Sequence, residues 1–278
     1  MTAIVLATAC AVVYGTADFF GGMATKRAPV YAVVVVSQIG GVLLLVPLLP
    51  LLPGTPDWAS LGWGALAGLA GGVALIVFYR ALASGVMSIV APTTAAASAA
   101  LPVVWGLAAG ERPSAGGLAG IALALVAVML VSREPARPGA APVKKLGPVL
   151  AALAAGAGFG LFFALLPAGE AGLWPLIGAR AGSIALVAAI ALGTRNTLRP
   201  GPGTLKVIVV AGVLDMAANV FFLMAKQEGL LSIVSVIASL YPASTLMLAR
   251  YVLGERLHVI QAAGVVLALG AVGLIALP

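Results

Sequence analysis

Three ionisable residues lie inside long apolar stretches of the chain, namely Asp18, Arg180 and Asp215. Burying an ionisable side chain in the membrane costs several kcal/mol of free energy unless it is paired or hydrated. Such a residue is therefore expected to have a function. A carboxylate can exchange a proton or bind a cation, and a guanidinium can hold a carboxylate through its planar fork of donors. The three residues therefore predict either a solute or proton site or an internal ion pair.

Asp215 begins a polar stripe. Asn219, Phe222 and Lys226 follow it at i+4, i+7 and i+11, which places all four on one face of a helix. One interpretation is the wall of a cavity, with Asp215 as a proton or cation site. The other is an ion pair with Arg180, which would otherwise be free to bind a substrate carboxylate. A pair that opens when substrate binds would serve both roles.

Asp18 shares a helical face with Tyr14, four residues earlier, among glycines and small residues. It is a candidate for a gate or a proton-linked role, or it is simply hydrated or paired with Lys26. Weaker candidates are Gln38 and a second polar group: Ser232, Ser235, Ser239, Tyr241 and Pro242. A proline inside a membrane span interrupts the helix, and interrupted helices often lie at transporter binding sites. Small residues for close helix packing are the alternative.

The composition identifies the elements that must position these residues. Of 278 residues, 62% are hydrophobic and 8% are charged, whereas soluble domains carry roughly 25% charged residues. The pattern predicts an all-α membrane protein. Spans of about 20 apolar residues are expected at 2–22, 30–52, 60–79, 86–109, 114–132, 147–167, 172–193, 205–225, 230–252 and 257–277.

The chain also repeats itself. Gly85-Val86-Met87-Ser88-Ile89-Val90 and Gly110-Glu111-Arg112 return as Gly229-Leu230-Leu231-Ser232-Ile233-Val234 and Gly254-Glu255-Arg256, a constant offset of 144 residues (110 to 254). Five spans fall in each half, and an odd number forces the halves into opposite orientations. We therefore predict two inverted five-helix repeats, 1–132 and 147–278, joined by a linker at 133–146. A fused duplication can complete its cavity within one chain, so a monomer is expected.

The repeat helps to separate function from structure. The counterpart of Asp215 is Gly71, and a requirement of the fold would be expected in both halves, which favours a functional Asp215. Glu111 and Glu255 do occur in both halves. Each precedes a helix whose positive N-terminal dipole suits a carboxylate, so a structural role is expected for them.

Loop charges predict the orientation. One set of alternate loops contains Lys26, Arg27, Arg80, Arg133, Arg137, Lys144, Lys145, Arg195, Arg199, Lys206, Arg250 and Arg256, and the other contains Arg112 and Lys226. Positive residues stay in the cytoplasm. The linker is therefore expected in the cytoplasm, both termini outside, and the protein in the plasma membrane. The net charge of +7 reports this orientation and does not indicate nucleic-acid binding.

Enzyme chemistry finds little support in the sequence. The chain has one histidine, one cysteine (Cys10) and no Gly-x-x-x-x-Gly-Lys-[Ser/Thr] phosphate loop. His258 lies at a loop edge, and no Cys/His or paired-carboxylate cluster predicts a metal. We therefore expect neither an enzyme nor a bound cofactor or metal.

Ten spans in two halves, with Gly-Glu-Arg before each last helix and Gly-x-x-Ser-Ile-Val at each fourth helix, resemble the EamA group of the drug/metabolite transporter superfamily. The resemblance implies a secondary transporter, often an exporter of amino acids or other small metabolites, with a central cavity between the halves. Two features differ. Members usually have both termini in the cytoplasm, and they often carry Trp-Gly in the first helix where this chain has Tyr14-Gly15.

The expected function is secondary active transport of a small metabolite by alternating access about a midplane cavity. Without a phosphate loop, ATP is not expected to drive the transport directly. Asp215 and Asp18 are the candidates for proton coupling, and Arg180, Asn219 and Ser239 for ligand contact. An amino-acid-like solute moving outward is the class that the resemblance favours. The alternatives are a non-transporting scaffold or subunit, with permanently paired charges, and an uncoupled facilitative exchanger.

Overall fold

The computed structural model describes residues 1–83, 87–133, 146–254 and 257–277. The predicted motif residues Gly85, Val86, Glu255 and Arg256, and linker residues 134–145, lie outside this set. All regular elements among the described residues are helices. Its helices are α1 (Thr2–Thr25), α2 (Val30–Leu48), α3 (Trp58–Ala83), α4 (Met87–Ala108), α5 (Ala115–Val131), α6 (Leu146–Leu165), α7 (Trp174–Gly193), α8 (Leu205–Glu228), α9 (Leu231–Ala238), α10 (Tyr241–Leu253) and α11 (Val259–Ala276).

Eight segments of the described chain are long and apolar enough to cross a membrane, with α9 and α10 together forming one of them. The apolar part of α4, Thr93–Ala108, and α5 are shorter. The expected ninth span is thus two helices separated by a turn at Ser239 and Leu240. Pro242 lies in the first turn of α10, where its missing N–H has no helical partner to lose. The predicted interruption therefore falls just before this proline.

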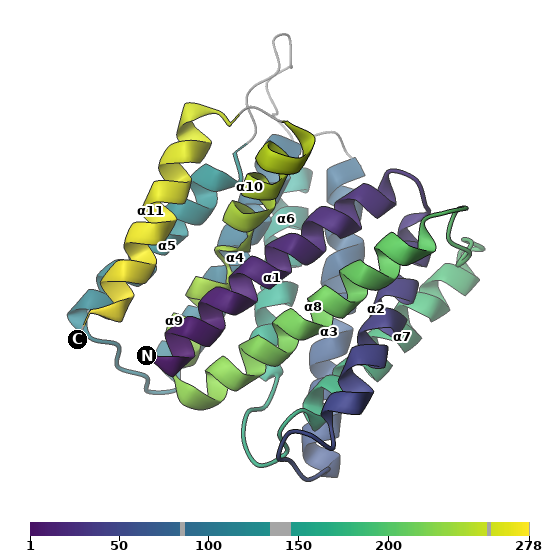
Figure 1. Cartoon of the computed structure of the whole chain (residues 1–278), viewed down its shortest axis with the longest axis horizontal. Coiled ribbons are helices and arrows are strands. Elements are labelled where there is room, and N and C mark those ends of the chain that lie inside the picture. The colour runs from purple at the N-terminus through teal and green to yellow at the C-terminus, as the bar shows by residue number, and fades with distance from the viewer. Residues whose placement is uncertain (84–86, 134–145, 255–256, 278) are drawn as a thin grey trace.

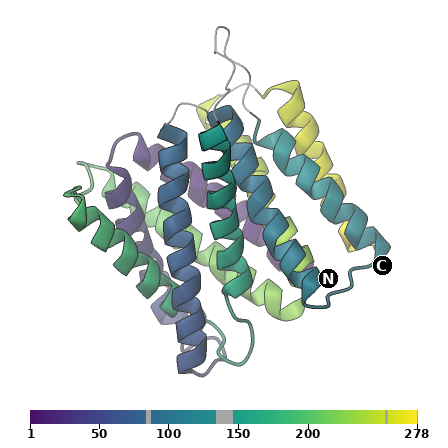
Figure 2. The same cartoon turned by 180° about the vertical axis from the view of Figure 1, so that it is seen from behind.

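The helices form two layers (Figures 1 and 2). One layer has the order α2, α8, α1, α10, and the other has the order α7, α3, α6, α4. Helices α5 and α11 pack on each other at one edge. The termini lie together at one end of the bundle (Figure 1), which we call the termini end. Arg133 and Leu146, which flank the linker, define the opposite, linker end.

Glycines allow neighbouring helices within each layer to approach closely. At Gly212 of α8 a Cβ would overlap the backbone carbonyl of Ser37 on α2, and at its repeat counterpart, Gly68 of α3, a Cβ would overlap the carbonyl of Ala179 on α7. In a membrane the hydrophobic effect does not hold helices together, so their association depends on close van der Waals packing. Small residues permit this packing. The glycines therefore allow the α2–α8 and α3–α7 pairs to pack this closely.

The largest buried cluster lies toward the termini end. It joins the first half of α1, the second half of α8, and α9, and includes Ala7, Cys10, Phe222 and Ile237. The linker-end halves of α1 and α8 contribute to a smaller cluster around Ala24 and Ile208. The bundle is therefore packed more extensively at the termini end.

Candidate functional site

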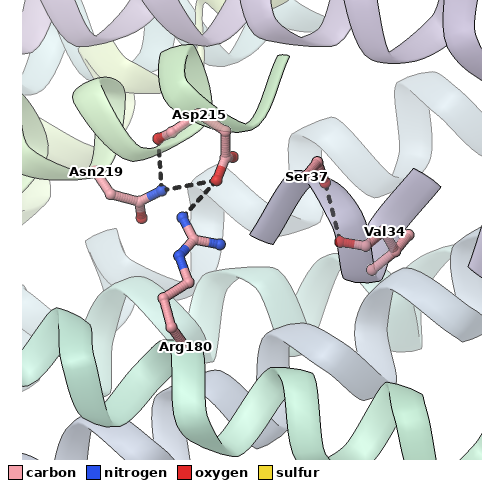
Figure 3. A network of polar contacts seen from close by, with 5 residues as sticks. All are labelled: Val34, Ser37, Arg180, Asp215 and Asn219. Carbon is pink, nitrogen blue, oxygen red and sulfur yellow. Dashed lines mark hydrogen bonds and ion pairs between the residues drawn. The ribbon is translucent and has the colours of Figure 1, made fainter. Parts of the chain in front are cut away.

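Arg180 and Asp215 form an ion pair between α7 and α8. The Arg180 guanidinium donates to Asp215 Oδ2 at 2.5 Å. Asn219 Nδ2 donates to the Asp215 backbone carbonyl at 2.8 Å and to Oδ2 at 3.4 Å (Figure 3). Both Asn219 contacts are to acceptors, which fixes its amide orientation and leaves Oδ1, buried, with no hydrogen-bond partner among the described residues.

Tyr14 and Asp18 of α1 face this pair. Helices α1 and α8 run antiparallel, because Ala3 lies beside Gly229 and Ala24 packs with Ile208. In this register Asp18 lies level with Asp215. Both Tyr14 and Asp18 are within electrostatic range of Asp215, and Tyr14 is also within range of Arg180. The structure therefore brings together residues that are about two hundred positions apart in the sequence.

The α1 stripe of Ala7, Ala11, Tyr14 and Asp18 changes from buried to accessible along the helix. Ala7 and Ala11 are buried, Tyr14 is partly buried and Asp18 is exposed. Asp18 lies on the buried face, away from the outward-facing Val5 and Val12, because positions seven and eleven apart share one side of a helix. Asp18 is therefore accessible on the side of α1 that carries Ala7 and Ala11, the side that packs against other helices.

The α8 stripe shows the same gradient. The Asp215 side chain is 39% exposed, whereas Asn219 is 2% and Phe222 is 0% exposed. Since α1 and α8 are antiparallel, the accessible members of the two stripes, Asp18 and Asp215, lie at one level, and the buried members that follow them lie toward the termini end. The predicted polar stripe exists, but beyond Asn219 it is packed.

Aromatic rings form the boundary between the accessible and packed parts. The Tyr14 ring lies 6.2 Å, centroid to centroid, from both Tyr241 and Phe163. The Phe163 ring lies 4.5 Å from that of Phe222. Rings from α1, α6, α8 and α10 therefore meet at one level of the bundle, directly below the accessible carboxylates on the termini side.

Lys226, the last member of the α8 stripe, is tied to the end of α6. Its Nζ donates to the backbone carbonyls of Phe163 (3.2 Å), Ala164 (3.2 Å) and Leu166 (2.6 Å). The last carbonyls of a helix lack intrahelical donors and carry a partial negative charge, so an ammonium satisfies both needs. Lys226 thus caps α6 and holds the termini end together.

Glu111 has a comparable role at the start of α9. Its Oε1 accepts from Leu231 N at 2.7 Å and its Oε2 from Ser232 N at 2.9 Å. The sequence suggested that Glu111 serves the helix that follows it, but α5 is capped by Ser114, which accepts from Gly117 N. The carboxylate reaches instead across to the other half of the chain, because that half brings the uncapped N-terminus of α9 beside it.

Replacing Glu111 by glutamine is expected to destabilise the protein by roughly 1–2 kcal/mol. The amide keeps one acceptor but turns its NH2 group toward a backbone N–H, and the charge that favours the α9 dipole is lost. Thermal unfolding of the purified protein would measure the change. Glu228→Gln removes an exposed carboxylate at the same end and is the control. Equal stabilities of the two variants would contradict the capping role.

The remaining sequence candidates lie apart from this group. Gln38 of α2 is buried and its Oε1 has no partner among the described residues, and no hydrogen bond in that part of the chain joins it to Asp215. The Ser239 hydroxyl donates to Val236 O at 2.7 Å within its own turn. The Ser232 and Ser235 hydroxyls are buried in α9 without a described partner.

Two contributors were not identified from the sequence. Phe163 supplies the aromatic contact to Tyr14, and the run Phe159, Phe162 and Phe163 in a chain with 8 phenylalanines is the signal that could have indicated it. Thr245 of α10 donates to the carbonyl of Gly15 at 3.0 Å, where a Cβ on Gly15 would meet α10. Only the fold reveals that second contact.

The arrangement offers charged and aromatic groups that can bind a solute. It has carboxylates, a guanidinium that is already paired, and aromatic rings around a solvent-accessible interior. Across the residues that the structure describes, no group of three or more His, Cys, Asp or Glu side chains could hold a metal ion. The fold and the site thus define a multi-pass helical membrane protein with a polar interior.

Comparisons with known proteins relate the second half of the chain to a known family. Residues 146–277 match the EamA-like transporter family, which is part of the drug/metabolite transporter superfamily. The chain therefore carries an EamA transporter domain over its second half, and the family resemblance seen in the sequence is confirmed there. No curated protein matches the chain. One similar solved structure, described only as "Crystal structure of protein", has a TM-score of 0.77 and 18% identity, covering 99% of this chain and 96% of that one. At that identity it supports the fold alone.

Proposed function

We propose that the protein is a secondary active transporter that carries a small metabolite through the interior between its two layers by alternating access. The observation that carries the proposal is the pair of solvent-accessible carboxylates on membrane-length helices, the exposed Asp18 and the partly buried Asp215. Such groups are expensive in lipid and are retained where they line a solute or ion pathway. The EamA domain supports the same class.

The helix pairing supports inverted repeats as the moving parts. The 144-residue offset equates α1 with α6, α2 with α7, α3 with α8, α4 with α9 and α10, and α5 with α11. Each neighbouring pair in one layer then has a counterpart in the other: α2–α8 with α7–α3, α8–α1 with α3–α6, and α1–α10 with α6–α4. Two five-helix units of 1–132 and 147–278, related by a pseudo-two-fold axis, would give this pattern.

In this proposal the structure represents the state open at the linker end. The Lys226 and Glu111 caps and the Phe163–Phe222 contact close the termini end. The basic residues Lys26, Arg27, Arg195, Arg199 and Lys206 lie at or between helix ends at the linker end. Because positive residues favour the cytoplasmic side, they support a cytoplasmic linker end with the termini outside. A fused duplication can complete its cavity within one chain, so the proposal is of a monomer in the plasma membrane.

The two carboxylates differ in their fitness for proton coupling. Asp215 is held by Arg180 and Asn219, so it must break an ion pair before it can bind anything else. Asp18 has no hydrogen bond or ion pair among the described residues and is the stronger candidate. Outward transport coupled to proton entry and uncoupled exchange are the two forms of the proposal, and the pH dependence of transport separates them.

A metabolite panel tests the function. Thermal unfolding of the purified full chain is measured at pH 6 and pH 8 with amino acids, organic cations, nucleosides and sugars. A solute present at 100 times its Kd should add about 2.7 kcal/mol of stability. A hit that weakens in Asp18→Asn but not in Glu170→Gln, an exposed control, is expected. If no metabolite of the panel stabilises a well-folded sample, the result would favour the alternative, a non-transporting scaffold.

A further inference from the structure

We propose that the solute is an amine cation with an apolar body, and that Asp18 is its counter-ion. This inference rests on the proposed transport function and narrows its substrate class. It follows from the charges inside the bundle, from the hydrogen-bonding capacity that is left over, and from the rings that flank Asp18.

The charges of the site leave one negative charge uncompensated. Two carboxylates, Asp18 and Asp215, lie level with each other on α1 and α8, and one guanidinium, Arg180, is paired with Asp215. The other cation near this level, Lys226, is held by three carbonyls on the packed side of the rings. No ion pair to Asp18 exists among the described residues. The uncompensated carboxylate would repel an anion near Asp18, whereas it would attract a cation.

The hydrogen-bond acceptors that have no partner among the described residues also favour a cation. Asn219 Oδ1 is buried without a partner among the described residues, and it is an acceptor because both Asn219 contacts fix the amide nitrogen on Asp215. The Asp18 carboxylate is also an acceptor. The complementary ligand is therefore a donor, as an ammonium N–H is, and a carboxylate solute would add further acceptors.

The flanking rings favour an apolar body on that amine. Tyr14 lies one helical turn from Asp18 and packs against Tyr241 and Phe163 at 6.2 Å. Ring faces attract cations within about 6 Å and bury apolar surface. Arg180 is 13% exposed and its charge is paired with Asp215, so it attracts a solute carboxylate less strongly than an unpaired guanidinium would.

The test compares four ligands that share a phenyl body and differ in charge. Binding of phenethylammonium, 2-phenylethanol, 3-phenylpropanoate and phenylalanine to the purified full chain is measured calorimetrically at pH 7. Phenethylammonium should bind most tightly, and Asp18→Asn should weaken it by roughly tenfold or more. Asp18→Glu should retain the preference for the cation, and Glu170→Gln should leave it unchanged.

Several results would overturn the inference. These are tighter binding of the propanoate or of phenylalanine, an unchanged affinity for phenethylammonium in a folded Asp18→Asn protein, or no binding of any of the four. If the metabolite panel still yields a solute in any of these cases, transport stands and only the cation assignment fails. If the panel is also silent, the transport proposal fails with it. Melting curves of each variant confirm that it is folded.

Discussion

Replacing Gly212 by alanine is expected to destabilise the protein by about 3 kcal/mol, at the upper end of the usual cost of overpacking. The added Cβ would overlap the backbone carbonyl of Ser37, and a backbone group within a helix cannot rotate away as a side chain can. Helices α2 and α8 would have to separate. Because Gly212 lies one turn before Asp215 on α8, the same shift would displace the ion pair.

Unfolding of the purified variant, followed by temperature or denaturant, measures this effect. Gly62→Ala is the matched control, since a Cβ there meets nothing within 4 Å and alanine favours a helix by up to about 1 kcal/mol over glycine. Gly68→Ala, at the repeat counterpart, should resemble Gly212→Ala because its Cβ would overlap the carbonyl of Ala179. If Gly212→Ala were as stable as Gly62→Ala, the close packing of α2 and α8 would be refuted.

Arg180→Gln is expected to cost roughly 1–3 kcal/mol of stability, because it leaves the Asp215 carboxylate without its partner and facing Asp18. The estimate is below that for a fully buried pair, because the Asp215 side chain is 39% exposed and water screens part of its charge. The double variant Arg180→Gln/Asp215→Asn should recover most of the loss. Transport should fall in both variants if the pair opens during the cycle.

A double-mutant cycle with Asp215→Asn gives the coupling energy of the pair directly. Arg199→Gln, on an exposed loop, controls for loss of a positive charge. A double variant whose loss equals the sum of the two single losses would show that Arg180 and Asp215 contribute independently and that the observed contact adds no stability.

The sequence was informative about features that local patterns encode. Hydropathy located the helices to within a few residues, as for α5 and α7, and Pro242 indicated the break between α9 and α10. The stripe spacing of Asp215 and Asn219 was also correct, because helical periodicity alone determines it. The ion pair of Arg180 with Asp215 was one of two alternatives, since both residues were expected at similar depth.

Other features depend on how distant helices pack, and a single sequence does not encode them locally. The burial of Phe222 and the capping of α6 by Lys226 require knowledge of which helix faces the second half of α8. Glu111 was expected to act on its own neighbour but reaches α9, about 120 residues away. The exposure of Asp18 inside the bundle likewise follows only once α1 and α8 are placed in register.

The most direct test of the central claim, an interior open at the linker end and closed at the termini end, is cysteine accessibility. In a Cys10→Ala background, single cysteines replace Ala7 and Asp18, and a membrane-impermeant maleimide is added to right-side-out or inside-out vesicles. We predict that the cysteine at position 18 reacts from the linker side, that the one at position 7 does not react, and that bound solute slows the reaction at 18. Equal reactivity at both positions, or none at 18 from the linker side, would contradict the account.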